Sequence, residues 1–294
     1  RISLLNMNGF LLIDKPKGVT SANCVYQLRK LLGIKKIGHC GTLDPLATGL
    51  LPICIGEATK FSSFMSNLDK TYEVEIRFGL ETDTGDIEGD IISKGVNNFN
   101  EIDLKSVLES FEGPQAQIPP MYSAIKIKGR PLYWWARKGV FLFRNERDVT
   151  INKIELLEFH NNLAKLKVSC SKGTYIRSFV ESVGRALLTR AVVVSLRRLT
   201  VGGINSDYMV LMPEQSKDIS GSILPSDFLL KHLSKAVLSK EDVKKVRNGQ
   251  SIYYNAQLEK KGLVRIYTNK SLFMGIGELH ASNKLSPRRL ISIN

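Results

Sequence analysis

The sequence predicts an α+β protein in two parts: a large domain of interspersed strands and helices over residues 1–228, and a small basic β-rich module over residues 229–294. Three observations support this prediction. Strand-like and helix-like hydrophobic patterns are interspersed along the first part. The length of 294 residues and the hydrophobic content of 43% suffice for a full core. The final part holds 13 Lys and Arg against 4 Asp and Glu, so its composition differs from that of the rest.

The first half of the chain alternates between strand and helix signals. The apolar run GFLLID (9–14) ends at the turn-forming KPKG and predicts a buried strand. Thr20 or Ser21 can cap the helix that follows, which Gly33 ends. We expect GHCGTLDPLATG (38–49) to be a loop, before an alternating strand in TYEVEIRFG and a helix in IDLKSVLESFEG.

The second half begins with a segment, 113–147, that is rich in Pro, aromatic and basic residues and contains both tryptophans. Such a composition predicts an excursion from the core. Two strand-like runs, 149–159 and 163–170, follow it. The next helix has its apolar face at Ile176, Phe179, Val180, Val183 and Leu187, and AVVVSLRRLTVGG predicts a further strand. In the final module we expect a helix at 240–247 and strands at 251–254, 263–268 and 272–279.

Charge and missing motifs narrow the function. A formal net charge of +14 favours a polyanionic partner such as nucleic acid, with a basic solvated surface as the alternative. The chain has no GxxxxGK[ST], GxGxxG, HExxH or GxSxG motif, and its four cysteines show no CxxC spacing. No run reaches the about 18 apolar residues of a membrane span. We therefore expect a cytoplasmic protein without a membrane segment, a metal site or a cofactor.

One carboxylate, Asp44, lies alone within GHCGTLDPLATG. Pro45 pushes the backbone of Asp44 toward extended angles, and Gly41 and Gly49 allow the loop to approach another backbone or a ligand closely. The side chain is therefore held in one direction, as a catalytic carboxylate requires. Because Asp-Pro is also a common turn opener, the residues alone leave both interpretations open.

Several longer motifs resemble those of the TruB family of tRNA pseudouridine synthases. They occur in the family's order: GFLLIDKPKGVTS, GHCGTLDPLATGLLPICIGEATK, KTYEVEIRFGLETDT, IPPMYSAIKIKGRPLY, CSKGTYIRS and SLRRL. The resemblance implies a mixed-sheet catalytic domain with an inserted RNA clamp and a PUA-type C-terminal domain. It also implies an isomerase that flips out uridine 55 of the tRNA T loop, breaks its glycosidic bond and rejoins carbon 5 to the ribose, without a cofactor.

The resemblance gives Asp44 the role of the catalytic carboxylate. In three alternative schemes it attacks the ribose anomeric carbon, attacks the uracil ring, or removes the ribose 2′ proton, and each scheme needs an ionised Asp beside an extruded nucleotide. Arg177 matches the arginine that pairs with this carboxylate and keeps it charged. A surface pair with Glu181, one helical turn further along, is the alternative for Arg177.

The remaining matches are substrate-binding and supporting residues. Tyr72 matches the aromatic residue that stacks on the uracil, with a plain core tyrosine as the alternative. Tyr175 and Leu196 match positions that line the uridine pocket, and His39 matches a residue that fills the gap left in the T loop. Lys15 and Lys60 also match family motifs, and we expect them to support the site or to contact phosphates.

The segment 113–147 resembles the family's insertion that closes over the T arm, with Lys126, Lys128, Arg130, Arg137 and Lys138 suited to phosphates. Guide-RNA-dependent relatives of the dyskerin type lack this element, so the resemblance favours an enzyme that acts as a monomer without an obligatory protein partner. The rival hypotheses are a guide-dependent synthase subunit and a non-catalytic RNA-binding protein or tRNA chaperone.

Overall fold

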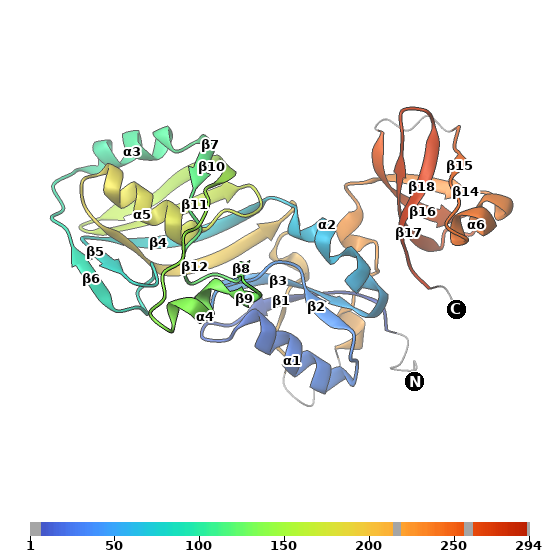
Figure 1. Ribbon diagram of the computed structural model, residues 1–294, viewed down its shortest axis with the longest axis horizontal. Helices are drawn as coiled ribbons and strands as arrows, with labels where there is room; N and C mark the ends of the chain where they lie inside the picture. The colour runs from blue at the N-terminus through green and yellow to red at the C-terminus, as the bar shows by residue number, and fades with distance from the viewer. Residues whose placement is uncertain (1–6, 214–218, 256–260, 293–294) are drawn as a thin grey trace.

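The computed structural model describes residues 7–213, 219–255 and 261–292. Within these ranges the protein has a nine-stranded mixed sheet with helices against it and, beside it, a curled five-stranded sheet (Figure 1). The predicted α+β class is confirmed. No helix in the described ranges has the length and apolar character needed to cross a lipid bilayer.

The large sheet is antiparallel except where β1 pairs with β13 and β3 pairs with β12. Strand β2 (Ile37–His39) pairs with β3 on the edge opposite to β1. The other strands lie in the order β13 (Val210–Leu211), β1 (Gly9–Lys15), β3 (Thr48–Ile55), β12 (Ala191–Val201), β4 (Lys70–Phe78), β11 (Leu163–Cys170), β10 (Arg147–His160), β7 (Gly113–Gln117).

Strand β1 is apolar from Phe10 to Ile13, and both of its faces are covered there. Leu11 and Ile13 belong to the main core, whereas Phe10 and Leu12 pack into a second core on the opposite face. A continuous apolar run is the pattern expected of a strand in this position. The sequence prediction for this strand is confirmed.

Three helices pack into the main core: α1 (Ser21–Leu32), α3 (Glu101–Ser110) and α5 (Ile176–Ala186). Thr20 caps α1 by accepting a hydrogen bond from the backbone of Asn23, and Gly33 ends it at φ 65°. The second core is covered by η2 (Gly56–Phe61), α2 (Ser62–Ser66) and η5 (Phe228–Leu230).

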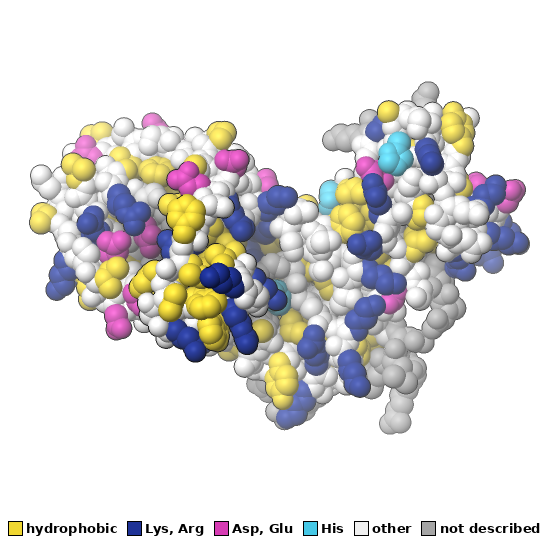
Figure 2. Space-filling model, in the orientation of Figure 1, with side chains coloured by type: hydrophobic (Ala, Val, Ile, Leu, Met, Phe, Trp, Pro, Cys, Tyr) yellow, Lys and Arg dark blue, Asp and Glu magenta, His cyan; other side chains and the backbone are white. Residues whose placement is uncertain are grey.

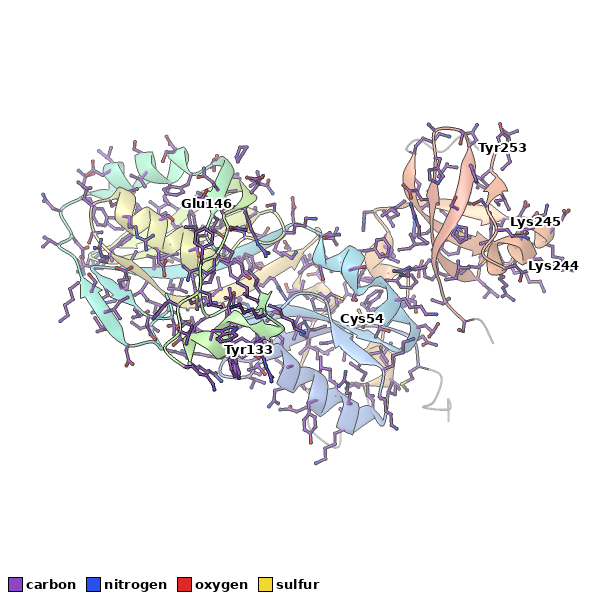
Figure 3. The ribbon with its side chains drawn as sticks, in the orientation of Figure 1. Cys54, Tyr133, Glu146, Lys244, Lys245 and Tyr253 are labelled. Atoms are coloured by element: carbon purple, nitrogen blue, oxygen red, sulfur yellow. The ribbon has the colours of Figure 1, made fainter. Side chains whose placement is uncertain are left out.

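The insertion begins later than the composition suggests. Residues Gly113–Gln117 form the edge strand β7 of the large sheet, so the excursion expected at 113–147 starts after Gln117. It contains the short pair β8 (Lys126–Ile127) and β9 (Arg130–Pro131) and helix α4 (Leu132–Ala136), which carries Tyr133 (Figure 3). A separate hairpin joins β5 (Leu80–Thr82) to β6 (Ile91–Lys94).

The C-terminal module is a five-stranded sheet with α6 (Lys240–Arg247) against it. The sequence predicts α6 and three of these strands, but not the first and last strands of the module in chain order, at 234–238 and 284–290. The strands lie in the order β14 (Ser234–Leu238), β16 (Gly262–Thr268), β17 (Phe273–Leu279), β18 (Lys284–Leu290), β15 (Ile252–Tyr253). The module's core is separate from those of the large domain. A domain boundary near residue 229 stays a proposal, because η5 itself packs into the second core.

The module docks on η2 through apolar and polar contacts. Ile276 and Phe273 pack into the second core, where the rings of Phe273 and Phe61 lie 5.5 Å apart. Glu57 accepts a hydrogen bond from the backbone of Ser292 at 2.9 Å and pairs with Lys36 (2.7 Å) and Lys60 (2.6 Å). Lys60 in turn donates to the carbonyl of Leu290 at 2.9 Å.

We expect Glu57→Gln to weaken this docking in a pH-dependent way. Burial raises the pKa of Glu57, but hydrogen bonds from Lys36 and Lys60 outweigh it and lower that pKa from 4.5 to about 2. The carboxylate therefore stabilises the fold above pH 4.5, and the contribution is lost as the pH falls toward 2. Urea unfolding should show a loss of about 1 kcal/mol in the variant at pH 7 that shrinks at pH 3. Glu101→Gln, at an exposed helical pair, is the control; a loss independent of pH would contradict the prediction.

Candidate active site

A cleft of about 350 Å³ opens where the main core of the large sheet ends. Tyr72 and Leu196 belong to that core and also line the cleft, so the sheet supplies its floor. The other walls come from the loop that contains Asp44, the start of α5 and the insertion. The charged and phenolic residues of the cleft are Asp44, Lys70, Tyr72, Tyr175, Arg177 and Arg198.

The loop around Asp44 is held on both sides of that residue. On one side, the Ser21 hydroxyl accepts a hydrogen bond from the amide of Leu43 at 2.9 Å and donates to the Leu43 carbonyl at 3.1 Å. On the other side, the Pro45 carbonyl accepts from the Gly18 amide (2.8 Å) and from the Lys15 ammonium (3.2 Å). The direction of the Asp44 side chain is therefore set by neighbours on β1 and α1.

Gly49 is the point at which the same loop joins the sheet. Its φ of +95° favours glycine, and a Cβ there would lie 2.3 Å from the Arg198 carbonyl oxygen. Strands β3 and β12 meet in parallel at this pair of residues. The close backbone approach predicted for Gly49 is confirmed.

Asp44 forms an ion pair with Arg177, which lies in the first turn of α5. The Nη2 atom of Arg177 lies 2.8 Å from Oδ2 of Asp44, and the guanidinium also donates to the carbonyls of Thr84 (2.7 Å) and Tyr122 (2.8 Å). The Arg177 side chain is 4% exposed and that of Asp44 is 33% exposed. Arg177 therefore pairs with Asp44 and not with Glu181, which pairs with Arg185.

The pair sets the ionisation of Asp44 through two opposing effects. Burial raises the pKa of Asp44 above its ordinary value, because a charged carboxylate loses hydration in the cleft. The charge of Arg177 opposes that rise by favouring the ionised form. The net effect is a raised pKa, so the carboxylate of Asp44 is more basic than that of an ordinary aspartate. When ionised, it is paired with Arg177.

Tyr72 lies on β4 directly opposite Arg198 on β12. Tyr72 is 8% exposed, and its side chain faces the same side of the sheet as that of Leu196. Leu196 pairs with Val74, two residues along β4 from Tyr72. Burial raises the pKa of the Tyr72 phenol, and the charge of Arg198 and a hydrogen bond with it oppose that rise. Tyr72 is thus part of the core on one side and part of the cleft floor on the other.

Tyr175 connects α5 to the root of the insertion. Its backbone amide donates to the Gln117 side chain at 2.7 Å, and the Gln117 amide group donates back to the Tyr175 carbonyl at 3.1 Å. One turn along the helix, the Ser178 hydroxyl donates to the Ile118 carbonyl at 3.0 Å. The insertion therefore leaves the sheet beside the cleft and is tied to the helix that carries Arg177.

The other predicted site residues lie away from the cleft lining. Lys15 is fully buried and donates to the carbonyls of Pro16, Val19 and Pro45, so it braces the Asp44 loop and has no free face for a phosphate. Lys60 is bound to Glu57 and Leu290 at the docking contact of the C-terminal module. His39 is half-buried on β2.

Sequence reasoning did not single out two cations of the cleft, Lys70 and Arg198. Burial and the charge of Arg198 lower the pKa of Lys70 to about 8, and its ammonium donates to the carbonyls of Ser66 and Leu68. Both residues stand inside quoted motifs, KTYEVEIRFGLETDT and SLRRL. Because side chains alternate along a strand, Lys70 lies on the same face of β4 as Tyr72. This alternation is the sequence signal that could have identified Lys70 as a cleft residue.

We expect Lys15→Met to destabilise the protein by about 1–3 kcal/mol, because it removes the three hydrogen bonds by which a fully buried ammonium holds the Asp44 loop. Urea unfolding at neutral pH measures the effect. Lys17→Met is the matched control, since Lys17 is 59% exposed and its pair with Glu88 spans 3.8 Å. Equal free energies of unfolding for the two variants would show that Lys15 does not brace the loop.

Two solved structures share this fold across nearly the whole chain. One, described as an H/ACA RNP bound to a substrate RNA containing 2′-deoxyuridine, gives a TM-score of 0.73 at 22% identity and covers 97% of this chain and 85% of that chain. The other, an archaeal box H/ACA sRNP Nop10-Cbf5 complex, gives 0.73 at 24% identity, with 99% and 88% covered. These likenesses confirm the fold of the large sheet and of the C-terminal module.

Family models match two stretches of the chain. Residues 29–176 match the N-terminal domain of TruB family pseudouridylate synthases, and residues 234–291 match the C-terminal region of pseudouridine synthase II TruB. A protein of Chromobacterium violaceum named tRNA pseudouridine synthase B is 41% identical over 98% of this chain and 95% of its own length. A protein of the same name from Pseudomonas putida (strain GB-1) is 42% identical, with 97% and 96% covered. Because such relatives align over nearly the full length of both sequences, the chain belongs to the TruB family of pseudouridylate synthases.

Proposed function

We propose that this protein isomerises uridine 55 in the T loop of tRNA to pseudouridine, using Asp44 and no cofactor. The observation that carries the proposal is the Asp44–Arg177 pair in a cleft floored by Tyr72 and Leu196. The names of the curated relatives support tRNA as the substrate. The resemblance of the motifs supports position 55.

The chemistry asks the protein to break the N1–C1′ bond, turn the uracil and form a C5–C1′ bond. The proton on C5 leaves, and N1 of the product carries one. Asp44 is suited to this reaction because the guanidinium of Arg177 favours the charged form of the carboxylate and binds its Oδ2 atom. The Oδ1 atom of Asp44 makes no ion pair in the described structure. The three schemes for Asp44 all begin from this ionised carboxylate beside an extruded nucleotide.

The cleft suits a base that has left its stack. Its volume of about 350 Å³ lies in the range of roughly 300–1,000 Å³ that small-molecule sites occupy. The Tyr72 ring and the Leu196 side chain offer apolar contact that replaces the lost stacking energy. Tyr175, two residues before Arg177, also lines the cleft.

The surface around the cleft favours RNA. On the insertion, Lys138 lies 4.4 Å and Arg130 5.4 Å from the ring centre of Trp134, and Phe143 is 87% exposed. Basic and aromatic groups interleaved in this way suit phosphates and bases. Figure 2 shows Lys and Arg side chains over the insertion and across the junction toward the C-terminal module. Lys244 and Lys245 project from α6 at the far side of that module (Figure 3).

The proposal includes an enzyme that acts alone, as a monomer, in the bacterial cytoplasm. The insertion supports this part, since it supplies from the same chain a surface that can hold the T arm. The curated relatives at about 40% identity carry a tRNA synthase name, whereas the H/ACA proteins share only 22–24% identity. Closeness in sequence thus favours the stand-alone enzyme over a guide-dependent subunit.

Asp44→Asn tests the function directly, because it keeps the shape of the side chain and its contact with Arg177 but removes the charge. We expect the purified wild-type protein to convert one uridine in tRNA, and in an isolated T-arm hairpin, as detected by mass spectrometry. The variant should give no product while binding tRNA within about threefold of wild type. Asp90→Asn, an exposed carboxylate, is the control. Pseudouridine made by Asp44→Asn, or a wild-type requirement for a second protein, would refute the proposal.

The pH dependence of the rate tests the role of Arg177. Asp44 must be ionised to react, and its pKa lies above the ordinary value, so the single-turnover rate should fall on the acid side at a higher pH than an ordinary aspartate predicts. Arg177→Gln removes the charge that lowers this pKa, so the acid limb should move to still higher pH. Arg185→Gln, an exposed arginine on the same helix, should leave the profile in place. An unmoved limb in Arg177→Gln would contradict the assignment.

A further inference from the structure

Arg198 is the largest fully buried side chain among the described residues, at 1% exposure. In that part of the chain no carboxylate forms an ion pair with it, and two other cations, Lys15 and Lys70, lie close enough to interact with its charge. A buried guanidinium without a counter-ion costs stability. Such a residue therefore calls for a reason beyond packing.

Its contacts join three parts of the site. The Nε atom donates to the Leu50 carbonyl at 2.7 Å, and Nη2 donates to the Gly41 carbonyl, in the Asp44 loop, at 3.2 Å. Across the sheet Arg198 lies directly opposite Tyr72, and both side chains line the cleft. Residues opposed in this way have their Cβ atoms about 5 Å apart. A hydrogen bond with Arg198 is among the interactions that act on the Tyr72 phenol.

The direction of the bond between them follows from their chemistry. A guanidinium has five N–H donors and no acceptor, so toward the Tyr72 oxygen it can only donate. The phenol proton must then point to a different acceptor. Because Tyr72 lines the cleft, a carbonyl oxygen of a bound base can be that acceptor.

We propose that Arg198 is a positioning residue that acts through Tyr72, and that its guanidinium turns the Tyr72 hydroxyl proton into the cleft as a hydrogen-bond donor to the extruded base. This inference rests on the proposed function. Because burial raises the pKa of Tyr72, the phenol keeps the proton that it is to donate at neutral pH. The uncompensated charge of Arg198 additionally favours the electron density that accumulates on the base oxygens when its glycosidic bond breaks.

A double-mutant cycle with Arg198→Lys and Tyr72→Phe tests the proposal. Under saturating tRNA we expect Arg198→Lys to lower kcat by about tenfold or more in the Tyr72 background, with KM and tRNA binding little changed. Tyr72→Phe should lower kcat as well, and adding Arg198→Lys to it should cost nothing further. An equal loss in both backgrounds would mean that Arg198 acts through the fold alone, and would overturn the proposal.

Arg197→Lys is the matched control, since Arg197 is the next residue along β12 and pairs with Asp14 on β1 at 2.7 Å. Its effect should be the same with Tyr72 and with Phe at that position. Tyr72→Phe removes one oxygen and keeps the ring, so an unchanged kcat in this variant overturns the proposal even where Arg198→Lys fails to fold. Wild-type protein that makes no pseudouridine would refute the proposed function itself, whereas product with an additive cycle refutes only the role of Arg198.

Discussion

The ion pair between Asp44 and Arg177 is the interaction on which the architecture of the site depends. A carboxylate in a half-closed cleft tends to take up a proton, and one guanidinium at 2.8 Å opposes that tendency. The surrounding structure serves to keep the two groups at this distance. Lys15 and Ser21 brace the loop on either side of Asp44, and α5 holds Arg177 in its first turn.

The same arginine couples parts of the chain that are far apart in sequence. Besides Asp44, its guanidinium binds the carbonyl of Thr84, between the hairpin strands β5 and β6, and that of Tyr122, in the insertion. A displacement of the insertion would therefore be transmitted to Asp44 through Arg177. The Gln117–Tyr175 bonds add a second link at the root of the insertion.

Periodicity and motif together predicted most of the fold and the centre of the site. Strand β1, the helices α1 and α5 and the loop at Asp44 follow from local patterns, because burial on known faces leaves a local signature. Strand β18 was missed because KLSPRRL carries a proline and two arginines, and its pairing with β17 is set by the partner strand rather than by its own residues. The burial of Arg198 and the distance of Lys60 from the cleft were equally beyond the sequence, since both depend on how β12 and the C-terminal module meet the rest of the chain.

Position 49 illustrates what this arrangement means for tolerance to mutation. Glycine permits β3 and β12 to close against each other, and any larger residue would push against the backbone of Arg198. Such a displacement would move β12, which also carries Leu196 in the lining of the cleft, although Gly49 itself does not line it. The closure of the sheet at a residue without a side chain is thus coupled to the position of a residue that lines the cleft.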